Sequence, residues 1–147
     1  MWKWSETFLN PYINMIDILL CFYRISIKWL ILDKEWKFLL CKESNGMWDF
    51  PGGGLEYKEN SRDSLKREIQ EEMWLTTLFI SEYPLYFLTA ISLSGKPIAN
   101  IFYEARVKNL DFRISHECQE IWFFSWEEAR HLSLFPNVEE FLKIYTL

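Results

Sequence analysis

The sequence predicts an α/β (α+β) fold in which helices pack on the faces of a mixed β-sheet. The prediction depends on the order of elements along the chain: strands first, then one strongly marked helix, more strands, and helical pieces at the C-terminus. With 147 residues, 50% of them hydrophobic and 18% aromatic, the chain can build one domain around a sizeable core. No repeat or linker divides it.

The first strands are expected at residues 25–32 and 37–43, joined by the polar turn DKEW into a hairpin. A loop follows at residues 44–46. The segment PGGG at residues 51–54 comes next, and it is too rich in glycine for an ordinary strand. We therefore expect a ligand-accessible turn there.

The marked helix is expected to begin at Asn60 or Ser61, either of which can cap its N-terminus. Leu65, Ile69 and Met73 recur at four-residue spacing, which predicts the stripe that the helix buries.

The rest of the chain predicts further strands and two closing helical pieces. The strands are expected at residues 75–81, 84–93, 98–107 and 120–126, the helical pieces at 127–132 and 137–145, and a hairpin turn at 94–97. Residues 1–24 are ambiguous, because a helix, a strand and a dimer-forming arm fit them equally well. We treat them as an N-terminal extension of a single domain at 25–147.

Charge and hydropathy narrow the class of partner. The net charge of −5 argues against DNA, RNA or an anionic membrane as the main partner. The apolar run at residues 13–32 is interrupted by Asp17, Arg24 and Lys28, so we expect no membrane-spanning helix. The N-terminus also lacks the pattern of a signal peptide.

The cysteines are Cys21, Cys41 and Cys118, which are odd in number, far apart and in no CxxC pair. We therefore expect neither a disulfide framework nor a zinc site, and interpret them as small buried hydrophobes. A reducing cytoplasm fits this usage best.

The helix carries a cluster of glutamates. Glu68, Glu71 and Glu72 stand at i, i+3 and i+4, so they share one side, next to the buried stripe. Like charges this close raise each other's pKa unless a cation neutralises them. Arg67 is one such cation, and Mg²⁺ or Mn²⁺, which prefer hard oxygen ligands, is another. A solvated charged helix face is the alternative interpretation.

The turn before the helix favours a binding site. Gly52, Gly53 and Gly54 let the backbone come close to a ligand and present its N–H and C=O groups. The turn lies at a fixed distance from Glu59 and from the glutamate cluster, and this combination is far more specific than either feature alone.

Together these residues resemble the Nudix box of the Nudix hydrolases. The positions that match in register are Gly53, Glu59, Arg67, Glu68, Ile69, Glu71, Glu72 and Leu75. The segment WDFPGG at residues 48–53 resembles the usual lead-in, and the likeness extends loosely from Tyr23 to the C-terminus. The resemblance implies a Nudix-like α/β/α sandwich with a mixed β-sheet.

The sequence departs from the motif at two positions. Trp74 stands at the late glycine, and Lys58 stands where a glycine is common before the first glutamate. A helix often ends on a left-handed residue, which glycine adopts without strain. Tryptophan there implies either strain of about 1 kcal/mol or more, or a different helix exit.

The resemblance implies an enzyme that acts on phosphoric anhydrides, a pyrophosphohydrolase in which water attacks phosphorus with the help of Mg²⁺ or Mn²⁺. Carried over by position, Glu71 and Glu72 would be metal ligands, and Glu68 would be a ligand or the base that activates water. The carbonyl of Gly52 or Gly53 would complete the coordination.

Further roles follow from the same resemblance. Arg67 would hold a glutamate in place through an ion pair, and Glu59 would support the junction between loop and helix. Some family members add a glutamate from a later loop, for which Glu117 and Glu120 are candidates; a polar loop before a strand is the alternative for each. His116 either binds phosphate or is a bystander.

The substrate expected by default is a nucleoside or deoxynucleoside triphosphate, because signatures of other Nudix subclasses are absent. Two alternatives stay open: a Nudix-fold module that binds nucleotide without cleaving it, motivated by Trp74 and Lys58, and an unrelated α/β domain with an accidental match. A homodimer is left open, since many relatives dimerise and the sequence shows no interface.

Overall fold

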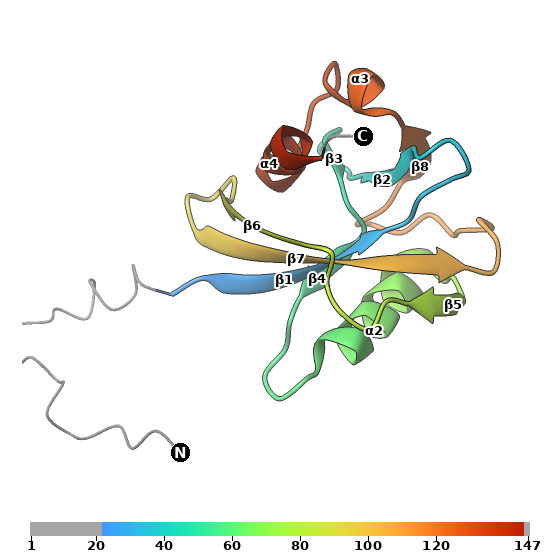
Figure 1. Ribbon diagram of the computed structural model, residues 1–147, viewed down its shortest axis with the longest axis horizontal. Coiled ribbons are helices and arrows are strands. Elements are labelled where there is room, and N and C mark those ends of the chain that lie inside the picture. The colour runs from blue at the N-terminus through green and yellow to red at the C-terminus, as the bar shows by residue number, and fades with distance from the viewer. Residues whose placement is uncertain (1–21, 146–147) are drawn as a thin grey trace, which may run out of the picture.

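The computed structural model describes residues 22–145, so most of the N-terminal extension lies outside the described residues. Its elements form two β-sheets with helices packed on them (Figure 1). The predicted mixed sheet with helices on its faces is confirmed. Among residues 22–145, no helix is long and apolar enough to cross a membrane.

The larger sheet has five strands and is mixed. Its members are β1 (Arg24–Leu30), β4 (Gly52–Gly54), β5 (Thr77–Ile80), β6 (Tyr86–Ile91) and β7 (Pro97–Val107). Strand β1 runs parallel to β7 and antiparallel to β4, while β5 and β6 each pair antiparallel with β7. The long β7 and the buried β1 therefore form the centre of the molecule.

The smaller sheet and the C-terminal helices cover the other side. The sheet is antiparallel and comprises β2 (Phe38–Lys42), β3 (Trp48–Asp49) and β8 (Glu120–Phe124), and it is followed by α3 (Trp126–Ala129) and α4 (Pro136–Ile144). In Figure 1, α2 (Ser61–Met73) lies below the larger sheet, and the smaller sheet with α3 and α4 lies above it. One apolar cluster fills each side.

The expected hairpin of the first two strands is wrong. Strand β1 pairs with β4 and β7, whereas β2 belongs to the smaller sheet. The two meet near their connection, where Leu32 forms a bridge with Phe38. The Asp33 N–H donates to the Lys37 carbonyl at 3.0 Å, and the Leu39 N–H donates to the Ile31 carbonyl at 2.9 Å. Residues 27–31 of the first strand are buried, which fits a central position between two neighbours better than a hairpin edge.

The glycine-rich segment is also a strand, contrary to expectation. Gly52–Gly54 pairs antiparallel with β1, so that Gly53 lies opposite Ile27. Glycine is required because a Cβ at Gly52 would collide with the Ile27 carbonyl, and one at Gly53 would collide with the carboxyl group of Glu68. The segment is therefore a strand whose missing side chains let α2 and β1 approach closely.

Helix α2 follows the prediction closely. Asn60 is its N-cap, and the Asn60 side chain accepts a hydrogen bond from the Asp63 N–H at 3.0 Å. The predicted stripe of Leu65, Ile69 and Met73 is buried against the larger sheet. The helix thus has one fixed face, and its rotation determines where the glutamates lie.

The later elements are confirmed, with bounds that differ by a few residues from those expected. Strands β6 and β7 form the predicted hairpin, whose turn is closed by the Gly95 N–H donating to the Ser92 carbonyl at 2.8 Å. The two closing helical pieces are α3 and α4.

The expectation that the cysteines are unpaired is wrong for two of them. Cys41 on β2 and Cys118 just before β8 form a disulfide with their Cα atoms 5.6 Å apart, although 77 residues separate them in sequence. The antiparallel pairing of β2 with β8 brings them together, and sequence spacing could not show that pairing. Disulfides persist mainly in oxidising compartments, so this one gives no support to the expected reducing cytoplasm. Cys21 lies outside the described residues.

Candidate active site

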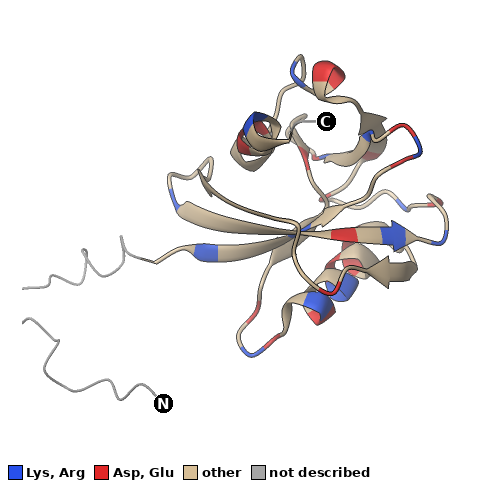
Figure 2. Cartoon of the chain, in the orientation of Figure 1, with Lys and Arg blue, Asp and Glu red and all other residues tan. Residues whose placement is uncertain are grey.

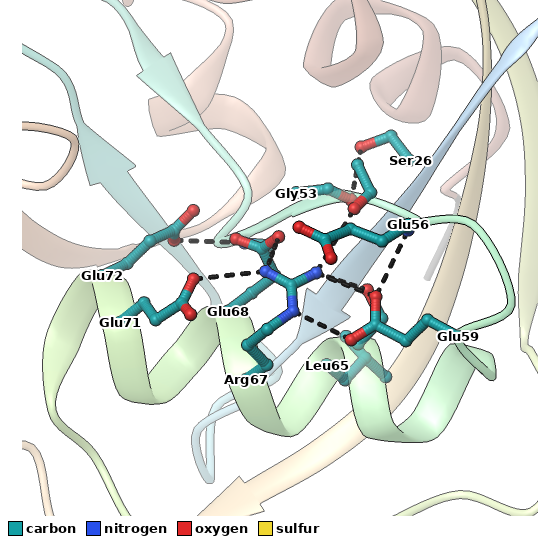
Figure 3. Close-up of polar contacts among 12 residues, drawn as sticks. Ser26, Gly53, Glu56, Glu59, Leu65, Arg67, Glu68, Glu71 and Glu72 are labelled. Carbon is teal, nitrogen blue, oxygen red and sulfur yellow. Dashed lines mark hydrogen bonds and ion pairs between the residues drawn. The ribbon is translucent and has the colours of Figure 1, made fainter.

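Helix α2 brings the three glutamates to one side, as the spacing predicted. Figure 3 shows Glu68, Glu71 and Glu72 beside Arg67, facing the loop that carries Gly53 and Glu59. Glu68 lies under the glycine strand with only 9% of its surface exposed, whereas Glu71 is exposed. Basic and acidic positions lie side by side on this helix (Figure 2).

Arg67 neutralises one half of the acidic side. Its Nε and Nη2 donate to the two carboxylate oxygens of Glu59 at 2.8 and 2.9 Å, and Nη1 reaches Glu68 at 2.7 Å and Glu71 at 3.2 Å. These hydrogen bonds from Arg67 lower the pKa of Glu59 to about 2 and raise the pKa of the guanidinium. Glu59 therefore ties the loop before α2 to the helix, as the resemblance implied.

Glu72 lies in a different environment. Its carboxylate accepts a hydrogen bond from the Gly52 N–H at 3.3 Å. Burial raises the pKa of Glu72 to about 8, and the nearby charges of Glu68 and Glu117 add to the rise, while Lys28 and the Gly52 N–H oppose it. The Glu72 end of the acidic side therefore lacks a cation of its own.

A buried lysine lies next to this end, and the sequence alone did not indicate its role. Lys28 Nζ donates to Asp49 Oδ2 at 2.7 Å and to the carbonyls of Phe50 and Gly52 at 3.2 and 3.3 Å. Burial lowers the pKa of Lys28, but the adjacent Asp49 outweighs it, so the pKa lies above its ordinary value. A lysine within the apolar strand ISIKWLIL was the available signal, although nothing local identified Asp49 as its partner.

The structure separates the two candidate loop glutamates. Glu117, with Ser115 and His116, faces Glu71 and Glu72 across a cavity of about 210 Å³. The side chain of Glu120 instead pairs with Lys42 of the smaller sheet at 3.5 Å. Of the two candidates, Glu117 thus lies with the helix glutamates and Glu120 does not.

The two glycine carbonyls proposed as metal ligands already accept hydrogen bonds. The Gly52 carbonyl accepts from Lys28, and the Gly53 carbonyl accepts from Ser26 Oγ at 3.3 Å. Each carbonyl has a second lone pair, so these bonds leave it able to bind a further partner.

The carboxylate oxygens of the helix glutamates and Glu117 suit a hard divalent cation, although the side chains are not yet arranged around a common point. Within residues 22–145, no group of three His, Cys, Asp or Glu side chains is arranged to hold an ion. Arg67 accounts for this, because it binds Glu68 and draws Glu71 toward itself. The surplus of carboxylate oxygens around Glu72 is what Mg²⁺ or Mn²⁺ prefers, and the exposed Glu71 is free to turn toward it.

Both departures from the motif adopt the backbone that glycine favours. Trp74 ends α2 with φ 60° and ψ 26°, and Lys58 has φ 67°, so both are left-handed. A different helix exit is therefore wrong for Trp74, and the strain expected there stays a prediction. The glutamates keep their positions on the helix.

The comparison with protein families decides the identity. The family model for the NUDIX domain matches residues 22–144. The chain belongs to the Nudix family. This confirms the resemblance and, with it, the prediction of an enzyme that acts on phosphoric anhydrides. A search of the curated proteins found no match for this Nudix protein.

Solved structures of similar fold agree. The MutT protein from Methanosarcina mazei Go1 is 26% identical, with a TM-score of 0.69 over 82% of this Nudix chain and 91% of that one. A MutT NUDIX hydrolase from Burkholderia pseudomallei has a TM-score of 0.71 at 20% identity, covering 85% of this chain and 99% of its own. An ADP-ribose pyrophosphatase from Streptococcus suis 89-1591 has a TM-score of 0.54 at 20% identity, covering 72% and 76%. The last two show the fold alone.

Proposed function

We propose that this Nudix protein hydrolyses the diphosphate linkage of a nucleoside diphosphate derivative, with a nucleoside or deoxynucleoside triphosphate as the default substrate and Mg²⁺ or Mn²⁺ as the metal. The observation that carries the proposal is the cavity in which Glu117 faces Glu71 and Glu72 and which no Lys or Arg of residues 22–145 lines. Burial raises the pKa of Glu72 to about 8, so a nearby cation is needed to ionise its carboxyl group at neutral pH. A divalent metal ion, bound together with the phosphate groups of the substrate, would supply that cation.

The residues that would hold the metal are Glu71 and Glu72, with Glu68 as a ligand or the base and Glu117 as a further ligand from the facing loop. When bound, the metal polarises the phosphoryl oxygens and lowers the pKa of the attacking water. The Gly52 N–H fixes the carboxylate of Glu72, and phosphoryl transfer depends mostly on such positioning.

Arg67 acts as a positioning residue in this proposal. It holds Glu68 at 2.7 Å beneath the glycine strand and anchors the loop through Glu59. Removing one of its partners therefore alters the geometry of the glutamates as well as their charge.

The test is the release of phosphate or pyrophosphate from a panel of nucleotide derivatives, with Mg²⁺, with Mn²⁺ and with chelator. We expect metal-dependent release that Glu72→Gln reduces about 1,000-fold, because transition-state charge stabilisation by a metal amounts to several kcal/mol. The glutamine variant keeps the size of the side chain, so without metal its melting temperature is not expected to fall.

A matched pair of variants tests the assignment of the loop glutamate. We expect Glu117→Gln to lower kcat/KM about 10- to 100-fold and Glu120→Gln to leave it unchanged, because only Glu117 lines the cavity with Glu71 and Glu72. Full activity of Glu72→Gln would overturn the role proposed for Glu72 in metal binding. A rise in melting temperature with nucleotide, but no product from any substrate, would instead indicate a nucleotide-binding module.

A further inference from the structure

The disulfide between Cys41 and Cys118 lies beside the active site, although the proposed function does not use it. Cys118 directly follows Glu117 in the chain. Glu117 in turn faces Glu71 and Glu72 across the small cavity. Cys41 belongs to β2, the central strand of the smaller sheet. The disulfide therefore joins a fixed point of the fold to the neighbour of a proposed metal ligand.

The loop that carries Glu117 is held by the backbone at its two ends. At one end, the Arg113 N–H donates to the Met73 carbonyl, the last residue of α2, at 3.1 Å. At the other end, the Gln119 N–H donates to the Lys42 carbonyl of β2 at 2.9 Å. Between these two points, no backbone hydrogen bond joins residues 114–118 to another element in the described part of the chain.

Inside the loop, the backbone bonds to its own turn. The Ser115 N–H donates to the Cys118 carbonyl at 2.9 Å, and the Cys118 N–H donates back to Ser115 Oγ at 2.9 Å. Cys118 is fully buried, whereas Glu117 is exposed. Cys41 Sγ also lies 3.8 Å from the carbonyl oxygen of Glu117. The disulfide is therefore the main link between this turn and the smaller sheet.

Electrostatic repulsion opposes this position of the turn when no metal is bound. Glu71, Glu72 and Glu117 line one cavity, and none of the described residues that line it is a Lys or Arg. Carboxylates that share a site repel one another, so an exposed loop tends to move its glutamate away. A link that already holds the loop in place lowers the conformational cost of binding a metal.

We propose that the Cys41–Cys118 disulfide positions Glu117 for the metal, and that opening the disulfide weakens metal binding and hydrolysis at this active site. The role is one of positioning, because neither cysteine lines the cavity. The inference rests on the proposed function, since it takes Glu117 as a metal ligand.

Opening the disulfide requires a reductant, for which a dithiol suffices. A thiolate of the dithiol attacks one sulfur and the S–S bond breaks. Two electrons and two protons pass to Cys41 and Cys118, which become thiols, and the dithiol is oxidised to its own disulfide. Cys118 is inaccessible and Cys41 is only 3% exposed, so the loop has to open before either sulfur is attacked.

The first test measures the affinity for Mn²⁺ by calorimetry and kcat/KM with Mg²⁺, in a Cys21→Ser background that prevents exchange with the third cysteine. We expect Cys118→Ser and Cys41→Ser each to weaken Mn²⁺ binding and to lower kcat/KM about tenfold. This is the lower end of the effect of groups that orient metal ligands. Unchanged affinity in both variants overturns the inference.

The matched comparison repeats both serine variants in a Glu117→Gln background. If the disulfide acts through Glu117, its removal there has no further effect, and affinity and kcat/KM are expected to stay within about twofold of Glu117→Gln alone. A disulfide that only stabilises the fold lowers both quantities by the same factor in the two backgrounds. That outcome overturns the inference and leaves the hydrolase intact.

The second test uses the wild-type cysteine pair and needs no turnover. It measures the rate at which dithiothreitol produces free thiols, with Mg²⁺ and with chelator. A metal bound to Glu117 keeps the loop closed, so we expect Mg²⁺ to slow reduction about tenfold and Glu117→Gln to lose this protection. Equal rates with Mg²⁺ and with chelator overturn the inference. Absence of Mn²⁺ binding by the wild type overturns the inference and the proposed metal site together.

Discussion

The acidic side of α2, taken with Glu59 of the preceding loop, has two halves that differ in their environment. In the first half, Arg67 bonds to Glu59, Glu68 and Glu71. In the second half, Glu72 has one backbone N–H, and the nearest buried cation, Lys28, is already bonded to Asp49. The pKa of Glu59 falls to about 2, whereas the pKa of Glu72 rises to about 8.

The difference shows that glutamates close together at this side of α2 lie in two different environments. The cluster around Arg67 is complete without any ligand and connects the loop to the helix. The Glu72 end is incomplete, because burial makes its charge costly and the nearby charge of Lys28 offsets only part of that cost. We therefore expect stability to depend mostly on the Arg67 cluster, whereas Glu72 gains most from a bound metal.

The largest effect is expected from breaking the complete half with Arg67→Met. Glu59 and Glu68, whose side chains are only 16% and 11% exposed, would lose their partner. We expect a loss of about 3 kcal/mol in unfolding free energy, near the lower end for removing one partner of a buried pair, since the network keeps some contact with water. Urea unfolding at pH 7 with chelator measures it.

Arg67→Lys is the matched control. It keeps the positive charge but loses the planar fork that binds several carboxylates, so an intermediate loss is expected. Equal stability of Arg67→Met and wild type would show that the network contributes nothing to the fold, and the contrast between the two halves would fail.

The second effect concerns the incomplete half and has the opposite sign. The folded state holds the Glu72 proton up to about pH 8, while the unfolded state releases it near its ordinary pKa of 4.5. The contribution of Glu72 to stability is therefore greatest below pH 4.5 and is lost as the pH rises through 8. With chelator at pH 8 or above, we expect Glu72→Gln to be more stable than wild type by about 2 kcal/mol, discounted from the full shift for partial exposure.

The measurement is the difference in unfolding free energy between wild type and Glu72→Gln from pH 5 to pH 9. With chelator, the difference is expected to grow with pH in favour of the variant. With Mg²⁺ it is expected to shrink or reverse, because the metal binds the ionised carboxylate of the wild type. A difference that stays constant across this range would mean that Glu72 is not held protonated in the metal-free protein.

Local patterns predicted the helix half of the site well. The spacing of Leu65, Ile69 and Met73 determined which face of α2 is buried, and this in turn placed Glu68 and Glu72 at the edge of the core. Such periodicity needs no knowledge of the rest of the chain.

Pairing over long sequence distances was not predictable in the same way. Cys41 and Cys118 meet because β2 pairs with β8, and the partner of Lys28 lies 21 residues away on another sheet. Asn100 looked like any polar residue of a strand, and only the packing of β1 and β6 on either side shows that its amide has no partner. In each case the information lies in strand order, which the periodicity of one segment does not contain.

The smallest effect comes from the end of α2, where Trp74 is left-handed and 55% exposed, with the guanidinium of Arg113 5.0 Å from its ring. Trp74→Gly removes the backbone strain and also the ring contact, whereas Trp74→Ala removes only the ring. Thermal unfolding of the two variants isolates the backbone term, for which we expect a gain of about 0.5–1 kcal/mol for glycine over alanine. Equal stability of the two variants would mean that the left-handed exit carries no strain. The pH comparison of Glu72→Gln, repeated in the Trp74→Gly background, then shows whether the helix exit also holds Glu72 in its buried position. An unchanged pH dependence would mean that the burial of Glu72 does not depend on the exit. A weaker pH dependence would mean that it does.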